Sequence, residues 1–150
     1  MKTKKLSKPK KTTAAKKSNN SYIWAVGRRK SAIARVRLFP NKKGETLVNE
    51  KPIEKYFPGE VLKKFYLSPL RACNIVGKYL ITIKVEGSGT KGQLDAVVHG
   101  ISRVLIKLDK ENFRPVLKKK GLLTRDPRTR ERRKVGTGGK ARRKKQSPKR

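Results

Sequence analysis

The chain has few acidic residues, and this scarcity is its first constraint on function. Only 10 of its 150 residues are Asp or Glu, against 43 Lys and Arg, so the formal net charge is +33. Paired-carboxylate catalysis needs acids that lie together, whereas these are scattered among lysines. A single histidine, His99, and a single cysteine provide no pattern of metal ligands. We therefore expect no enzyme, no catalytic residue, no metal and no cofactor.

Cysteine pairs and long apolar runs are also missing. Cys73 is the single cysteine, which excludes an intramolecular disulfide and fits a reducing compartment. No stretch reaches the roughly 18 apolar residues of a transmembrane helix, so no membrane partner is expected. Residues 1–20 lack the apolar core of a secretory signal, and their 8 Lys predict a solvated basic arm instead.

The positive charge lies mainly at the two ends of the chain. Residues 1–20 hold 8 Lys and no acid, and residues 118–150 hold 16 Lys and Arg against 2 acids. No aromatic follows Phe113, so the last segment cannot offset about 1–2 kcal/mol of backbone entropy per ordered residue. We predict a disordered extension (1–21), a globular domain (22–117) and an extended basic tail (118–150). Such a tail orders only on dense negative charge, which indicates nucleic acid.

Strand and helix patterns alternate between these arms and predict an α+β domain with helices on one face of a sheet. In one strand Arg35 and Arg37 alternate with apolar residues, which places them on an open face. Core packing is predicted for the aromatics. Pro58-Gly59 and Ser68-Pro69 are the expected helix breakers. The predicted strands are 22–26, 32–39, 46–48 and 78–86, and the predicted helical turns are 52–57 and 60–67.

A single apolar stripe from Leu94 to Leu108 predicts a helix of four turns, which should end within residues 109–115. Thr90 and Gln93 match a capping box that would open this helix. Gly100 in its interior costs roughly 1 kcal/mol relative to Ala, so we expect a backbone or another neighbour to approach closely there.

Two loops are candidates for binding phosphate. Residues 27–31, Gly-Arg-Arg-Lys-Ser, predict a turn whose three cations meet phosphate, because guanidinium donates two parallel charge-assisted bonds; a solvated charged turn is the alternative. Residues 86–93 form a glycine-rich loop before a helix N-terminus, where anions bind. Gln93 and Leu94 stand where a P-loop requires Lys and Ser/Thr, so no nucleotide is expected. RNA phosphate and a merely tight turn both remain open for this loop.

Three stretches of the sequence together match the pattern of a known family: VGRRKSAIARV (26–36), VEGSGTKGQ (85–93) with VHGISRVL (98–105), and GLLTRDPRTRERRK (121–134). In them the chain resembles the universal small-subunit ribosomal protein S-nine family, in its bacterial or organellar form. The resemblance covers roughly residues 22–150. It implies a four-stranded sheet with helices on one face and a left-handed βαβ crossover, as in the second domain of ribosomal protein S-five.

The resemblance also implies a function. It places the chain in the head of the small ribosomal subunit, on the 3′ major domain of the ribosomal RNA and beside neighbouring ribosomal proteins. It implies that the tail reaches the anticodon stem-loop of the peptidyl-site tRNA. The expected location is the ribosome of the cytoplasm or of an organelle.

Motif matching and the charge pattern assign these contacts residue by residue. Lys149 and Arg150 are the predicted tRNA contacts. The chain departs from the family where Ser147-Pro148 replaces an aromatic and a serine, in the glycine-rich residues 136–139, and in the Lys-rich residues before Tyr22. The predicted ribosomal-RNA contacts are Arg28, Arg29, Lys30, Arg35, Arg37, Lys118, Lys119, Lys120, Arg125, Arg128, Arg130, Arg132, Arg133, Lys134, Lys140, Arg142 and Arg143.

Two other classes of protein fit parts of the pattern. A histone-like protein that compacts nucleic acid would explain the basic arms, but not the patterned domain or residues 124–126. An RNA-processing enzyme could share the fold, but it needs the acid or metal cluster that the sequence lacks.

Overall fold

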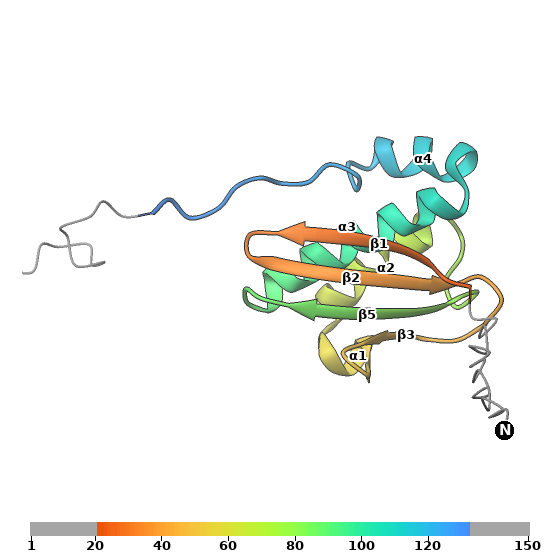
Figure 1. The fold of residues 1–150 in the computed structure, drawn as a ribbon, viewed down its shortest axis with the longest axis horizontal. Coiled ribbons are helices and arrows are strands. Elements are labelled where there is room, and N and C mark those ends of the chain that lie inside the picture. Colours follow the sequence, from red (N-terminus) through yellow and green to blue (C-terminus); the bar gives the residue numbers. More distant parts are fainter. Residues whose placement is uncertain (1–20, 133–150) are drawn as a thin grey trace, which may run out of the picture.

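The alternating segments pair into one sheet, and the helical segments cover one of its faces (Figure 1). The structure, a computed structural model, describes residues 21–132. The predicted α+β fold, with helices on one face, is confirmed. The elements in chain order are β1 (Ile23–Arg29), β2 (Ala32–Phe39), β3 (Thr46–Val48), β4 (Lys51–Pro52), α1 (Ile53–Tyr56), α2 (Glu60–Ala72), β5 (Leu80–Glu86), α3 (Thr90–Leu108) and α4 (Lys110–Lys119).

The sheet has the strand order β1-β2-β5-β3-β4. Strand β2 is antiparallel to both β1 and β5, whereas β3 is parallel to β5. The chain therefore crosses from β3 to β5 through α1 and α2. The resemblance implied four strands; the fifth, β4, is a two-residue strand that pairs with β3 at the edge of the sheet.

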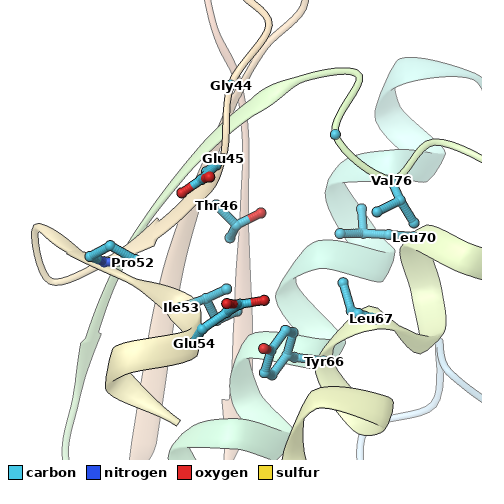
Figure 2. A pocket seen from close by; sticks show the side chains of 11 residues that line it. Gly44, Glu45, Thr46, Pro52, Ile53, Glu54, Tyr66, Leu67, Leu70 and Val76 are labelled. Carbon is cyan, nitrogen blue, oxygen red and sulfur yellow. The ribbon is translucent and has the colours of Figure 1, made fainter. Parts of the chain in front are cut away.

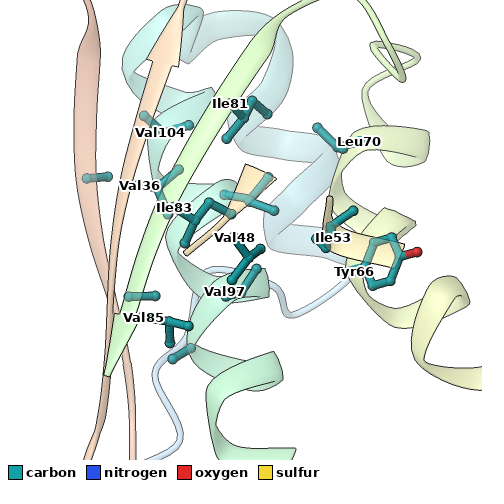
Figure 3. Packing of buried hydrophobic residues seen from close by; sticks show 14 of the residues in the cluster. Val36, Val48, Ile53, Tyr66, Leu70, Ile81, Ile83, Val85, Val97 and Val104 are labelled. Carbon is teal, nitrogen blue, oxygen red and sulfur yellow. The ribbon is translucent and has the colours of Figure 1, made fainter. Parts of the chain in front are cut away.

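The core lies between the sheet and α3, where the apolar phases of both meet (Figure 3). Val36 and Ile83 point from the sheet toward Val97 and Val104 of the helix, and all four side chains are buried. The predicted close approach at Gly100 is confirmed, because a Cβ there would lie 2.6 Å from Val36 Cγ2. This contact holds α3 directly against β1 and β2.

Two helices differ from their predicted extents. Ser68-Pro69 does not break α2, because Pro69 and Leu70 are buried, and that packing outweighs the missing backbone hydrogen bond. Residues 109–115 do not close the helical region but begin α4, where the Asp109 side chain accepts a hydrogen bond from Asn112 N at 3.1 Å. Leu117 of this helix is fully buried.

Helix α4 extends into the range predicted for the tail, residues 118–150. The sequence predicts Lys118 and Lys119 as part of the tail, whereas they form the last turn of α4. Leu122 and Leu123 then pack against the core. The division of the chain after residues 21 and 117 stays a prediction. Among residues 21–132, none of the helices combines the length and apolar character that a membrane span requires.

Candidate nucleic-acid interface

The face of the sheet that carries no helix is cationic. The predicted phase of β2 is confirmed: Arg35 and Arg37 are exposed there, whereas Val36 between them is buried. Arg35 lies between Val26 and Lys84 of the neighbouring strands. We call this surface the open face. Its outward residues on the three long strands are Trp24, Val26, Arg28, Ile33, Arg35, Arg37, Phe39, Leu80, Thr82, Lys84 and Glu86.

One acid moderates the charge of the open face. Glu86 lies 3.2 Å from Arg35 Nη1 and 3.6 Å from Lys84 Nζ, and all three side chains are more than half exposed. Exposed pairs of this kind contribute little to stability, so the arginine remains available to another anion. The open face therefore presents clustered cations to solvent.

An aromatic side chain, that of Trp24, also lies on this surface. The prediction that the aromatics pack in the core is confirmed for Phe57 and Tyr66 but wrong for Tyr22, Trp24 and Phe65, which are 45%, 58% and 56% exposed. The ammonium of Lys107 lies 4.8 Å from the centre of the Trp24 ring, a cation–π contact. Trp24 thus gives the open face a flat apolar surface beside its cations.

Polar side chains of α3 cover the free edge of β1. Arg28 N donates to His99 Nδ1 at 3.4 Å. Arg103 donates to the carbonyl of Val26 at 2.6 Å, and Lys107 donates to that of Trp24 at 2.9 Å. These three α3 residues recur every fourth position, so they form one row along the helix. Sequence reasoning treated His99 alone and missed this row, which blocks pairing of β1 with another strand.

Arg29 lies on the other side of the β1–β2 hairpin from Arg35. Alternation along β1 places it in phase with the buried residues Ala25 and Gly27, and its side chain is only 13% exposed. Its Nε lies 3.5 Å from the carboxylate of Asp95 on α3. The predicted phosphate-binding turn at residues 27–31 is wrong in extent, because β1 continues through Arg29 and leaves a two-residue turn at 30–31.

The first residues of the tail meet Arg29. Its Nη2 lies 3.1 Å from Asp126, and its Nη1 donates to the carbonyl of Arg128 at 2.6 Å. Arg128 in turn donates to Asp126 from its backbone N at 2.9 Å and from Nη2 at 2.7 Å. The hydrogen bonds from Arg128, together with the charges of both arginines, hold the pKa of Asp126 well below its usual range. This carboxylate is therefore ionised at neutral pH.

The remaining predicted contacts lie on the surface or outside the described residues. Arg28 and Lys30 are exposed at the end of the hairpin, and Lys118, Lys119 and Lys120 are exposed at the end of α4. Arg125, Arg130 and Arg132 are exposed in the segment that follows Leu123. Seven predicted contacts lie outside the described residues: Arg133, Lys134, Lys140, Arg142, Arg143, Lys149 and Arg150.

The glycine-rich loop is a tightly packed turn. The predicted capping box is absent, because Gly89 is the N-cap of α3 and makes no side-chain cap bond. Gln93 instead donates to the carbonyl of Gly87 at 3.1 Å and accepts from Tyr56 Oη at 2.9 Å. Gly87 has a φ of +80°, and a Cβ there would overlap the carbonyl of Ser31. The tight turn, one of the two interpretations of this loop, is therefore present, and the binding of RNA phosphate at this helix end stays a prediction.

A pocket between the β3–β4 edge and α2 has a different character (Figure 2). Glu45 and Glu54 line it together with apolar side chains, and its lining within the described residues includes no Lys or Arg. The Tyr66 hydroxyl, which is buried, has no hydrogen-bond partner among residues 21–132. Such a lining repels phosphate, so the pocket lies outside the candidate interface. Over the same residues, no group of three or more His, Cys, Asp or Glu is placed to hold a metal.

Comparison with known proteins identifies the family. The sequence model of the family described as "Ribosomal protein S9/S16" matches residues 27–150. The chain is 46% identical over 121 residues to "Small ribosomal subunit protein uS9" of Maridesulfovibrio salexigens, which is 81% of this chain and 92% of that protein. The same identity and coverage hold for the protein of that name from Solidesulfovibrio magneticus. This family has a structural, non-enzymatic role in the small ribosomal subunit, and the chain belongs to the ribosomal protein S9 family.

Proposed function

We propose that the chain binds the RNA of the small-subunit head through its open face and the basic segment after α4. We further propose that the end of its tail contacts the peptidyl-site tRNA. The open face itself supports the first proposal, because Arg35 and Arg37 of β2 are exposed on the face of the sheet that no helix covers. Guanidinium groups held on a rigid strand match phosphate oxygens in pairs without losing much conformational freedom.

The segment after Leu123 supports the same proposal. Arg125, Arg130 and Arg132 are exposed there, and Figure 1 shows this stretch of the chain running past the β1–β2 hairpin and away from the domain. An extended strand of arginines follows an RNA backbone and releases its counterions. About ten phosphate contacts would give a slope near −9 in a plot of log affinity against log salt.

The proposed contact with tRNA depends on residues outside the described range. Lys149 and Arg150 carry two cations at positions that match the family pattern. The 27 residues that follow Leu123 would span on the order of 90 Å if extended, which is enough to reach a site far from the domain. We place the chain in a cytoplasmic ribosome, because both relatives named above are bacterial proteins.

Binding to RNA tests the proposal for the open face. The full-length chain is titrated onto a fragment of the 3′ major domain at several salt concentrations. Arg35→Ala with Arg37→Ala should weaken binding by at least about tenfold, because each charge-assisted hydrogen bond contributes about 1.5–3 kcal/mol. The salt slope should become shallower by about 1.8, because each phosphate that the variant no longer neutralises changes it by about 0.9.

The matched control removes two exposed lysines from the helices, Lys55→Ala with Lys64→Ala. It makes the same change in net charge, and we expect its affinity to stay within about twofold of the parent's. An equal loss of affinity in both variants would show that net charge, rather than the open face, determines binding. Equal affinity of the parent for duplex DNA would favour a general compacting protein. Turnover of RNA would favour an enzyme.

Removal of Ser147 to Arg150 tests the proposal for the tail. We expect normal incorporation into the small subunit and weaker tRNA binding at the peptidyl site. Loss of incorporation would contradict this division of roles, because it would make the last residues necessary for assembly.

A further inference from the structure

We infer that Arg29 and Asp126 are positioning residues, which hold the start of the tail against the domain and set the direction in which it leaves. Asp95 and Arg128 complete this arrangement, and we call the four residues the clasp. The inference deepens the proposed RNA-binding function and rests on it. It also replaces the phosphate contact that the sequence predicted for Arg29.

Each of the three nitrogens of the Arg29 guanidinium already faces an acceptor within the protein. Nε faces Asp95 at 3.5 Å, Nη2 faces Asp126 at 3.1 Å, and Nη1 donates to the carbonyl of Arg128 at 2.6 Å. The side chain is 13% exposed. A phosphate approaching it would also meet the two carboxylates. Arg29 therefore joins β1, α3 and the tail rather than the protein and RNA.

The tail is stiffened where it meets the clasp. Asp126 accepts a hydrogen bond from Arg128 N at 2.9 Å, which closes a local turn across Pro127. The Arg128 guanidinium donates to both oxygens of the same carboxylate, from Nε at 3.0 Å and from Nη2 at 2.7 Å. Proline restricts φ at the position between them. These bonds fix residues 126–128 as one unit.

A second attachment lies a few residues earlier. Gly121 has a φ of +68°, and Leu122 N donates to the carbonyl of Leu117 at 3.1 Å, so the chain turns back at the end of α4. Leu122 and Leu123 then pack against the core. The tail is therefore attached to the domain at two places, through Leu122 and Leu123 and through the clasp. Two attachments fix the direction of the segment between them, whereas one alone would let the tail rotate about it.

If the clasp fixes the direction of the tail, the affinity for RNA should change on neutralisation of Asp126 in a way that net charge alone does not predict. Asp126 is an acid in a segment that we propose binds RNA, so its neutralisation should strengthen binding if only net charge matters. If the clasp pre-orients the tail, neutralisation should weaken binding, because the RNA must then order a freer segment. The two explanations give opposite signs.

The first experiment measures the direction without RNA. Spin labels are placed at Lys64→Cys on α2 and Thr129→Cys in the tail of the full-length chain, in a Cys73→Ser background. Pulsed electron paramagnetic resonance should give a narrow distance distribution for the parent and a broad one for Asp126→Asn. Arg29→Ala should broaden it at least as much, because this variant loses both the ion pair with Asp126 and the hydrogen bond to the Arg128 carbonyl. The double variant should broaden it no further than Arg29→Ala. A narrow distribution in all variants would overturn the inference.

The second experiment measures affinity for the ribosomal-RNA fragment at one salt concentration. Asp126→Asn should bind about threefold to tenfold more weakly than the parent, which corresponds to one or two freed side chains. The matched control is Glu131→Gln, which removes the same charge from a residue that has no ion pair within residues 21–132. It should bind as tightly as the parent or slightly more tightly.

The results separate the clasp from the proposed function. Suppose that the parent binds the RNA fragment more tightly than duplex DNA. If Asp126→Asn then binds the fragment at least as tightly as the parent does, the positioning role is wrong. If the parent binds the fragment and duplex DNA equally tightly, the proposed function fails. The distance measurement, which uses no RNA, then still decides whether the clasp holds the tail. Unfolding midpoints of Asp126→Asn and the parent should agree, since the side chain lies outside the core.

Discussion

The open face and the clasp both contain arginines of the β1–β2 hairpin, yet the structure gives them different surroundings. Arg35 is 53% exposed in its side chain and faces one exposed acid, Glu86. Arg29 is 13% exposed and faces two carboxylates and a carbonyl. The positions differ in strand phase, not in charge. In the β1–β2 hairpin, strand phase therefore determines which arginine is exposed to solvent and which is held against other groups of the protein.

The position of Arg29 beside Asp95 depends on the contact between β1 and α3, and Gly27→Val should break that contact. A Cβ at Gly27 would overlap the carbonyl of Ala96 and lie close to the backbone of Gly100. Because backbone cannot move aside as a flexible side chain can, we expect the free energy of unfolding to fall by about 3 kcal/mol. Urea denaturation at fixed salt measures it.

Gly89→Ala is the matched control for this substitution. A Cβ at Gly89 would meet nothing within 4 Å, and the residue has a negative φ of −97°. Its unfolding free energy should stay within about 0.5 kcal/mol of the parent's. Equal stability of the two variants would mean that β1 and α3 are not in direct contact, and Arg29 would then have no fixed position beside Asp95.

Parts of this arrangement follow from local patterns in the sequence. The phase of β2, with Arg35 and Arg37 outward, follows from strict alternation, and the apolar stripe of α3 follows from helical spacing. The close approach at Gly100 follows from the cost of glycine within a helix. Each of these depends on residues near one another in the chain.

The clasp could not be predicted in the same way. Arg29 and Arg128 are separated by 99 positions, and no local pattern pairs them. Two signals were available: the alternation Ala25, Gly27, Arg29, which continues the buried phase of β1, and Asp126 before a proline, which favours a local turn. Helix α4 was missed because its proline indicated an end, whereas burial of Leu117 stabilises the helix around it.

Acid should destabilise the folded domain through His99. Burial, and then the charge of Arg103, lower the pKa of this imidazole below its usual value. The unfolded chain therefore takes up a proton near its ordinary pKa of about 6.5, where the folded chain resists it. The unfolding free energy should fall from pH 7 to pH 5, by less than about 1 kcal/mol because His99 is partly solvated.

His99→Gln isolates this contribution. The variant should lose less stability than the parent between pH 7 and pH 5, measured by urea denaturation at each pH. An identical pH dependence in the two proteins would assign the effect to other groups and leave His99 without a role in it.

The smallest expected effect is on the open face, at Glu86→Gln. This exposed acid lies beside Arg35 and Lys84, so its removal leaves both cations free for phosphate. Exposed pairs contribute about 0.2–1 kcal/mol, and affinity for the ribosomal-RNA fragment should therefore rise about twofold at low salt and return to the parent value at high salt. Asp126→Asn removes the same charge and should weaken binding instead. A change of the same sign in both variants would mean that the two acids act alike, through net charge, and that strand phase does not divide the arginines of this domain into RNA contacts and positioning residues.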